Sequence, residues 1–460
     1  MIIKNHHWIA LTGISLSLLI LNMSPAAAIL TPRQMLSAGL ILCAIIVFAT
    51  SALPEYITAL LLMTGAMLLE VAPASVVFSG FYSTACWLIF SGLVIGIALK
   101  KTKLTQRLAG LFGQRVTASY WRIIAATVSI STLVGFLMPS SLGRAVLLVP
   151  IAMAIADKCS FSQQSNGRIG IALAVAFGCH VPTFAVLPAN VPNMVMIGAA
   201  EASYDWVPAY AHYLLLHFPV LGLLKALLII GLIVWLYPDR PKQQTNISKQ
   251  TAFSKQEYQL ILVLAITLCF WMTDTLHNIS AAWIGLTTAC LLLMPGIGII
   301  EKREFNSQFN IASLIFVVGI LSLGAIINDS ELSQLLGDQF STWLPLSVKT
   351  PFINFMALSL TAAATAIFTT LPGVPIVLTP FAESMSISSG FSIEAVIMTQ
   401  VLGFSTIVFP FQSAPLVVAM QLAGVSLKHA AKLCLILTAI TITILFPLDY
   451  LWWSLIDEIN

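Results

Sequence analysis

The feature that most limits what this chain can fold into is a series of long apolar runs that carry almost no charge. Only 8% of the residues are charged and 58% are hydrophobic, which leaves too few Asp, Glu, Lys and Arg side chains to coat a water-soluble surface. A run of about 17 to 25 apolar residues is long enough to cross the hydrocarbon core of a bilayer. Such runs are predicted at 8–28, 35–52, 56–71, 84–99, 211–236, 258–273, 281–298, 311–327 and 433–453. The sequence therefore predicts an all-α polytopic membrane protein with about 11 transmembrane helices, and it excludes an ordinary soluble enzyme.

The sequence lacks the motifs that several other classes of protein require. The small net charge of +3 has no basic domain behind it, which argues against a nucleic-acid binder. The seven cysteines show no metal-ligand spacing, and no Gly-x-x-x-x-Gly-Lys-Ser/Thr loop or His-Glu-x-x-His motif occurs. We expect no enzyme activity, no cofactor other than a coupling sodium ion, and an ion or solute gradient as the source of energy.

The Lys and Arg residues set the predicted orientation, because cytosolic loops carry an excess of them. The segment 100–122 holds six basic residues and no acidic one, so we place it in the cytosol. Alternating from there puts 17 of the 21 Lys and Arg residues on the cytosolic side and only Arg33 and Lys349 on the other side. This predicts a protein of the bacterial inner membrane with a cytosolic linker at 237–256 and its C-terminus outside.

The first apolar segment has two interpretations. Residues 1–28 carry Lys4 ahead of an apolar stretch and three alanines at 26–28 after it. A first transmembrane helix and a cleavable secretory signal share this pattern. The predicted topology of the remaining chain is the same in both cases.

The rest of the chain divides into two related halves. The string SSLGRAVLLVP at 140–150 resembles TLPGVPIVLTP at 370–380. The string VPNMV at 191–195 resembles APLVV at 414–418, so the matches occur in the same order about 225 to 230 residues apart. Each half holds an odd number of crossings, so we predict that the second is inserted upside down. The predicted parts are repeat 1 at 29–236, with a re-entrant hairpin at 119–157 and a broken helix at 169–200, the linker, and repeat 2 at 257–460, with a re-entrant hairpin at 352–388, a broken helix at 391–424 and a last helix at 433–453.

Four polar interruptions mark where the chemistry is expected. Proline removes an amide donor and forbids a continuous helix. Unwound backbone is tolerated at membrane depth only where it faces protein or a water-filled cavity. Inverted repeats with such breaks at corresponding places are typical of secondary transporters whose site lies near the bilayer midplane. The interruptions lie at 139–144, 178–193, 369–373 and 409–415.

In this order the hairpins, broken helices and linker resemble the divalent anion:sodium symporter family of the ion transporter superfamily, which includes citrate and dicarboxylate carriers. The resemblance covers nearly the whole chain. Ser140 lies ten residues before Pro150, and Thr370 lies ten before Pro380, as the Ser-Asn-Thr strings of that family do. Both tip Asn residues of the family are absent from this chain.

Arg144 is the most informative single residue. It takes the Arg position of the Ser-Asn-Thr-Ala-Arg strings in some dicarboxylate carriers, and a guanidinium within the membrane is costly without a partner or substrate. Its planar fork suits a carboxylate or sulfate, and the alternative is that it extends to the cytosolic headgroups. The resemblance implies contacts to substrate carboxylates from Ser140, Ser141, Arg144, Asn190, Asn193, Thr370, Gln412 and Ser413. It implies sodium binding near Ser140, Gly178, Thr183, Thr369 and Gly373.

Asn190, Asn193 and His180 also have structural interpretations that involve no substrate. Asn190 and Asn193 are equally suited to cap the second half of the broken helix. His180 suits hydrogen-bonded packing as well as contact with a solute or a proton.

The leading hypothesis is a secondary active transporter of small divalent organic anions (dicarboxylates), driven by a sodium gradient or by anion exchange and working by alternating access. Sulfate or another inorganic anion is an alternative substrate. A cation/proton antiporter of the same superfamily would need a carboxylate buried near the hairpin tips, whereas the acidic residues are expected in loops or at span ends. A non-transporting sensor or scaffold also stays open. The expected partners are a small anionic solute and the lipid bilayer, with no nucleic acid, and the resemblance implies a homodimer.

Overall fold

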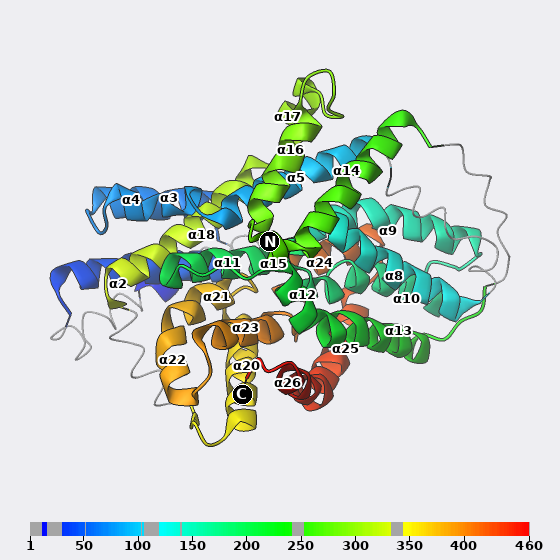
Figure 1. Cartoon of the computed structure of the whole chain (residues 1–460). Helices are drawn as coiled ribbons and strands as arrows, with labels where there is room; N and C mark the ends of the chain where they lie inside the picture. The colour runs from blue at the N-terminus through cyan, green and yellow to red at the C-terminus, as the bar shows by residue number, and fades with distance from the viewer. Residues whose placement is uncertain are drawn as a thin grey trace.

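The structure is a computed structural model that describes residues 12–15, 30–50, 52–102, 104, 119–138, 140–241, 253–332 and 344–459. Within these ranges every regular element is helical (Figure 1). Apart from residues 12–15, the predicted leader or first span at 1–28 lies outside the described residues, as do most of the basic segment and most of the linker. The all-α fold predicted from the apolar runs is confirmed.

Each half of the described chain contains α-helices, short 3₁₀ turns and one π-helical turn. The elements of the first half are α2 (Pro32–Thr50), α3 (Glu55–Leu68), α4 (Ala74–Val77), η2 (Ser79–Phe81), α5 (Thr84–Thr102), α8 (Tyr120–Leu137), α9 (Ser141–Lys158), α10 (Asn166–Gly178), η3 (Pro182–Ala185), η4 (Leu187–Ala189), α11 (Val191–Tyr204), α12 (Tyr210–His217), the π-helical η5 (Phe218–Leu224) and α13 (Lys225–Leu236). Those of the second half are α14 (Lys255–Met272), α15 (Asp274–His277), α16 (Ala281–Leu293), α17 (Lys302–Gln308), α18 (Ile311–Asp329), α20 (Pro351–Phe368), α21 (Gly373–Leu378), η6 (Thr379–Phe381), α22 (Ala382–Ser389), α23 (Ile393–Phe404), η7 (Pro410–Gln412), α24 (Ala414–Leu422), α25 (Leu427–Ile440), the π-helical η8 (Thr441–Leu445) and α26 (Phe446–Leu455).

Seven helices in the described part of the chain are long and apolar enough to cross a membrane. They are Thr84–Thr102, Tyr120–Leu137, Asn166–Ala185, Tyr210–Leu236, Ile311–Asp329, Pro351–Phe368 and Leu427–Leu455. An eighth candidate is the pair Gly373–Ser389 and Ile393–Phe404, which is bent by 116°. The chain is therefore a polytopic membrane protein, while the count of about 11 crossings stays a prediction.

The segment predicted as the first hairpin consists of α8 and α9. Ser140 caps the start of α9, because its Oγ accepts the N–H of Gly143 at 3.1 Å. In the corresponding segment of the second half, α20 is followed by a second arm in three pieces, α21, η6 and α22. Pro375 and Pro380 lie in that arm, and each removes an amide donor from it.

The first broken helix consists of α10, two 3₁₀ turns and α11. α10 ends at Gly178. Pro182 is the first residue of the turn η3, and Pro188 lies inside the turn η4. A proline inside an α-helix removes a hydrogen bond and clashes with the preceding turn, which explains the interruption. All residues from 178 to 190 are buried, so the unwound backbone faces protein.

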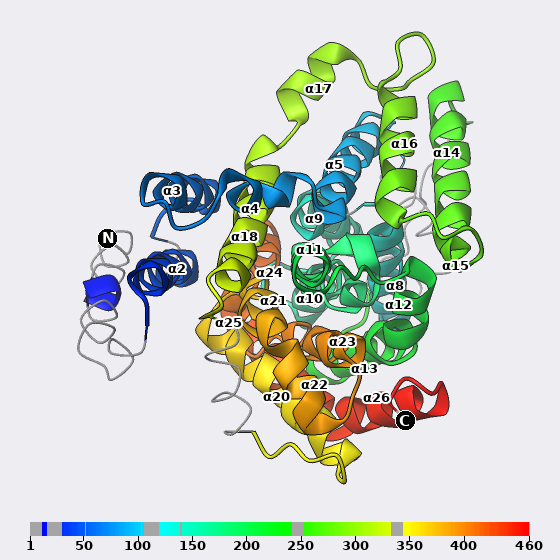
Figure 2. The same ribbon diagram turned by 60° about the vertical axis from the view of Figure 1, so that its left-hand side comes forward.

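The two halves are interleaved. α16 of the second half packs along α5 of the first, and α3 of the first packs along α18 of the second (Figures 1 and 2). The second arm of each hairpin segment also meets the broken helix of the other half, because α9 packs against α24 and α21 packs against α11. This crossed packing holds the polar interruptions between the two halves.

α18 packs so closely against α3 that a side chain at Gly319 should destabilise the protein. A Cβ atom on Gly319 would lie 2.2 Å from Cβ and 2.7 Å from Cα of Ala59, so the two helices would have to separate. We expect Gly319→Ala to lower the melting temperature of the detergent-solubilised protein through overpacking worth about 1–3 kcal/mol of the free energy of unfolding. Gly324 on the same helix is the control, because a Cβ atom there meets nothing within 4 Å and alanine favours a helix. Equal melting temperatures for the two variants would contradict this packing.

Candidate functional site

Arg144 lies in the first turn of α9, at the tip of the first hairpin segment. Its side chain is 0% exposed. The alternative that it extends to the headgroups is therefore wrong, because a side chain that did so would leave the protein interior.

Oxygen atoms from three segments hold the guanidinium. Nε and Nη2 both donate to the carbonyl oxygen of Cys179, at 3.0 and 2.7 Å. Nη1 donates to the carbonyl oxygens of Met138 and, at 3.0 Å, of Ala189, and Nη2 donates to Thr183 Oγ1 at 2.9 Å. All five N–H donors are thus engaged. The side chain joins the end of α8, the end of α10 and the turn before α11.

The charge of Arg144 has no acidic partner among the described residues, since their ion pairs are all made elsewhere. The N-termini of α9 and α11 also lie beside it. Ser141, the first residue of α9, donates through Oγ to Oδ1 of Asn190, which is the N-cap residue of α11. Each helix N-terminus is equivalent to about half a positive charge. The C-termini of α8 and α10 also lie beside Arg144 and offset these two N-termini. The group formed by Ser141, Arg144, Thr183 and Asn190 therefore keeps the one positive charge of the guanidinium, which no acidic side chain among the described residues balances.

The two asparagines of the first break brace the turns and do not cap α11. Asn190 makes no side-chain cap, and its Nδ2 donates to Thr183 Oγ1 at 3.1 Å. Asn193 donates through Nδ2 to the carbonyl oxygens of Phe184 and Val186, at 3.0 and 2.9 Å. The Oδ1 atom of Asn193 is buried without a hydrogen-bond partner.

His180 and Gly178 lie beside this group. Both ring nitrogens of His180 are buried without a hydrogen-bond partner, and the ring packs edge-on against Phe184 with the centroids 4.8 Å apart. Gly178 is a point of close packing, because a Cβ atom there would lie 3.0 Å from Val128 Cα on α8. Its carbonyl oxygen accepts a hydrogen bond from Thr132 Oγ1 at 3.3 Å.

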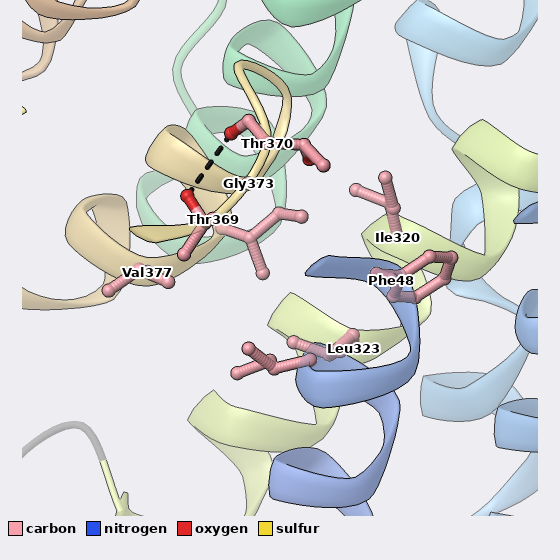
Figure 3. A pocket seen from close by; sticks show the side chains of 9 residues that line it. Phe48, Ile320, Leu323, Thr369, Thr370, Gly373 and Val377 are labelled. Carbon is pink, nitrogen blue, oxygen red and sulfur yellow. Dashed lines mark hydrogen bonds between the residues drawn. The ribbon is translucent and has the colours of Figure 1, made fainter. Parts of the chain in front are cut away.

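The tip of the second hairpin segment lies beside a small pocket (Figure 3). The pocket measures about 20 Å³, which is room for about one water molecule. It is lined by Ile45, Phe48, Ile320, Leu323, Thr369, Thr370, Gly373, Ile376 and Val377. Thr369 Oγ1 donates to the carbonyl oxygens of Thr365 at 2.8 Å and of Thr370 at 3.1 Å. The threonines thus supply the polar wall of a pocket that α2 and α18 otherwise make apolar.

Gln412 and Ser413 lie at the second break. Gln412 donates through Nε2 to the carbonyl oxygen of Ala366 near the end of α20, at 2.7 Å. Ser413 caps α24, because its Oγ accepts the N–H of Leu416 at 3.3 Å. Gln412 joins a hairpin arm to a break, as Arg144 does in the first half, but it brings no charge.

The structure brings only part of the predicted site residues together. Ser141, Arg144, Thr183 and Asn190 form one hydrogen-bonded group, and Ser140 lies next to it at the cap of α9. The remaining predicted residues divide between the pocket at the second tip and the second break. The apolar wall of that pocket was missed, because an apolar residue on a spanning helix looks the same in sequence whether it faces lipid or protein.

Two further buried charges lie outside the predicted site. Asp449 is 0% exposed within α26, so an acidic residue near the end of the predicted last span at 433–453 lies in the protein interior. Lys225, at the start of α13, is 1% exposed. The only sequence signal for either was a charged residue inside an apolar run.

Broken helices in an all-helical membrane fold are typical of membrane transporters. Residues 45–405 match the model of the citrate transporter family, CitMHS. The chain therefore belongs to this family. Assignment to the divalent anion:sodium symporter family in particular stays a prediction.

Two curated relatives and two solved structures are similar to this chain over most of its length. A membrane protein of Cupriavidus necator is 24% identical over 378 residues, covering 77% of this chain and 73% of that protein. An uncharacterized transporter of Haemophilus influenzae is 21% identical over 444 residues, covering 91% and 92%. The Alcanivorax borkumensis YdaH transporter shares the fold with a TM-score of 0.54 and 15% identity, over 86% of this chain and 90% of that one. Neisseria gonorrhoeae MtrF, described with a class of antimetabolite efflux pumps, has a TM-score of 0.50 and 14% identity, over 98% and 97%.

The contacts of Arg144 make a prediction about stability. An ammonium carries three donors on a single nitrogen, so it cannot reach Met138, Cys179 and Ala189 together. We expect Arg144→Lys to lower the melting temperature through the loss of about 2–4 kcal/mol of hydrogen bonding to a buried charge. Arg303→Lys, on the exposed surface of α17, is the control and should melt like the unaltered protein. A melting temperature for Arg144→Lys that equals the control would contradict the clamp.

Proposed function

We propose that this protein is a secondary transporter of small multivalent organic anions, with citrate and dicarboxylates as its substrates. The single observation that supports the proposal most is the buried guanidinium of Arg144, which no carboxylate contacts among the described residues and which lies beside two helix N-termini. Charges interact more strongly in a protein interior than in water, and helix N-termini favour anions. A multivalent anion supplies the charge that this centre lacks.

In the proposed mechanism Arg144 acts as a fixed charge. Its five donors are engaged by oxygen atoms, so it attracts the anion without giving up its own contacts. The proposed backbone ligands of the anion are the first-turn N–H groups of α9 and α11. Gly143 is not one of them, because Ser140 caps it, and Pro192 has no N–H group. The side chains proposed to contact it in the first half are Ser140, Ser141, Asn190 and Asn193. Those proposed in the second half are Thr370, Gln412 and Ser413.

The same geometry favours the second half as the place for a coupling sodium ion. Around Gly178 and Thr183 the carbonyl oxygens already hold the guanidinium, and a second cation there would be repelled by it. The pocket beside Thr369 and Gly373 has room for about one water molecule and no cation in its lining. We therefore propose sodium binding at the second tip. Transport without sodium would instead be an exchange of anions.

The class of substrate is supported by the family as well as by the charge. The family is described as citrate transporters, and citrate carries three carboxyl groups. Sulfate is also a divalent anion, so the transport assay has to separate it from carboxylates. An inner-membrane location, a cytosolic linker, an outer C-terminus, alternating access and a homodimer belong to the same proposal.

Uptake into proteoliposomes tests the proposed function. We expect the purified protein to accumulate labelled citrate and succinate above the level in protein-free liposomes, and to accumulate sulfate much less. The reason is that the anion site is lined by amide and hydroxyl groups spread over two half-helices, which suits a carboxylate chain. Absence of uptake of any of the three anions, with or without a sodium gradient, would contradict the proposal. Faster uptake of sulfate than of either carboxylate would reassign the substrate.

The proposed sodium site makes a separate prediction. Changing Thr369 and Thr370 together to Val replaces both hydroxyl groups with methyl groups, which cannot bind a cation. We expect this variant to need a higher sodium concentration for half-maximal citrate uptake, because two oxygen ligands are lost. Thr361→Val is the matched control, since Thr361 Oγ1 bonds only to a carbonyl one turn earlier in α20, that of Ala357, at 2.7 Å. If sodium activates the threonine variant as it does the control, sodium binds elsewhere.

A further inference from the structure

A larger pocket lies where two membrane-spanning helices end. It measures about 450 Å³ and is lined by Ser119, Tyr120, Trp121, Val234, Pro238, Asp239, Arg240 and Pro241. The first three residues lie at the start of α8 and Val234 lies in the last turn of α13, and these two helices pack side by side (Figure 1). The spans to which they belong are Tyr120–Leu137 and Tyr210–Leu236. Because a span ends where the hydrocarbon core meets the headgroups, the pocket lies at the level of the headgroups.

Exposed tryptophans mark the same level. Trp121 is 54% exposed, and Trp235 in the last turn of α13 is 71% exposed. Indole rings gather at the boundary between hydrocarbon and headgroups, because they are apolar with one polar N–H group. The guanidinium of Arg122 lies over the ring of Trp121, 5.6 Å from its centroid. These side chains place the pocket in the layer that phospholipid headgroups occupy.

The wall formed by residues 238–241 is attached to the start of α10. The N–H group of Gly167 donates to Asp239 Oδ2 at 2.7 Å, and Asn166 Nδ2 donates to the carbonyl oxygen of Pro238 at 3.3 Å. Pro238 and Pro241 restrict the backbone further, because proline fixes φ. The wall is thus held in one shape without a ligand, which lowers the entropic cost of binding one.

The lining carries one charge of each sign. Arg240 is exposed, and its side chain makes no hydrogen bond and no ion pair to the part of the chain that the structure describes. Asp239 accepts the N–H of Gly167 through Oδ2 and that of Arg240 through Oδ1, the latter at 2.8 Å. A carboxylate has about four lone-pair positions, so Asp239 can accept further hydrogen bonds. The pocket therefore offers a guanidinium to an anionic group and a carboxylate to a cationic group.

We propose that this pocket binds the headgroup of a zwitterionic phospholipid with a primary ammonium group, phosphatidylethanolamine. The phosphodiester binds Arg240, whose planar fork suits phosphate oxygens. The ammonium donates to Asp239, and the aromatic ring of Trp121 attracts a cation as well. The acyl chains extend from the pocket into the bilayer. The inference goes beyond the proposed transport function and does not depend on it.

Other occupants match the two charges less well. Phosphatidylglycerol has a phosphate but no cation, so Asp239 would repel it. Phosphatidylcholine carries its positive charge on a nitrogen with three methyl groups, which cannot donate a hydrogen bond to the carboxylate. Inorganic phosphate has the anionic group alone and no chains to hold it in the bilayer. Selectivity for the amino lipid therefore distinguishes the proposed headgroup from these three ligands.

Native mass spectrometry of the purified, delipidated full chain tests the pocket. We expect phosphatidylethanolamine to bind more tightly than phosphatidylglycerol or phosphatidylcholine, each added alone. Arg240→Gln should weaken its binding about tenfold, because one charge-assisted hydrogen bond is lost. Asp239→Asn should weaken it by a similar factor and strengthen the binding of phosphatidylglycerol, because the repelling charge is gone. Arg303→Gln, on the exposed surface of α17, is the matched control and should bind all three lipids like the unaltered protein.

Four outcomes would overturn the proposal. They are equal binding of the three lipids, tighter binding of phosphatidylglycerol than of phosphatidylethanolamine, displacement of the bound lipid by excess inorganic phosphate, and binding of phosphatidylethanolamine that both pocket variants retain. If Asp239→Asn does not fold, Arg240→Gln decides alone, because its side chain supports no other described residue. Absence of citrate uptake would contradict the proposed function and leave the result for the lipid standing.

Discussion

Unwound backbone inside a membrane protein has to find hydrogen-bond partners, and this requirement governs the centre of the fold. Both broken helices end in carbonyl groups that no helical neighbour can satisfy. Side chains from other helices meet them: Arg144 binds the carbonyls of Cys179 and Ala189, and Lys225 binds that of Ser405. Each of these side chains belongs to a different element from the carbonyl that it binds. Satisfying the backbone therefore also fixes how the hairpin arms and the outer helices pack on the breaks.

The two halves meet this requirement with different chemistry. In the first half a guanidinium joins hairpin and break, so the link carries a permanent positive charge. In the second half the amide of Gln412 makes the corresponding link to the carbonyl of Ala366 and carries none. The uncharged half also has the pocket at the hairpin tip, lined by hydroxyl groups and apolar side chains. This asymmetry underlies the proposal that the first half attracts the anion and that the second binds a coupling cation.

Apolar runs and prolines made the fold class and the places of the breaks predictable, because helix length and missing amide donors are local properties of the chain. Arg144 was also identifiable, since a charge inside a span needs a reason. Its partners were not, because they are backbone carbonyls of Met138, Cys179 and Ala189, which have no sequence signature. The burial of Asp449 was not predictable for a related reason. Whether a charged side chain near the end of the chain faces protein or water depends on tertiary packing, which the apolar pattern does not encode.

A permanent charge at the proposed anion site raises the question of how the anion is released. Arg144 keeps its charge at every physiological pH, and its donors are held by the fold, so its attraction for an anion is the same on both sides of the membrane. Release therefore has to be driven by a change elsewhere. In the proposed mechanism that change is the loss of the sodium ion at the second tip, or the exchange of one anion for another. α12 also contacts the first break, since Tyr213 donates to the carbonyl oxygen of Phe184 at 2.8 Å. The helices α12 and α13 thus bond to both broken helices, because Lys225 donates to the carbonyl of Ser405 at the second break and Tyr213 donates to that of Phe184 at the first.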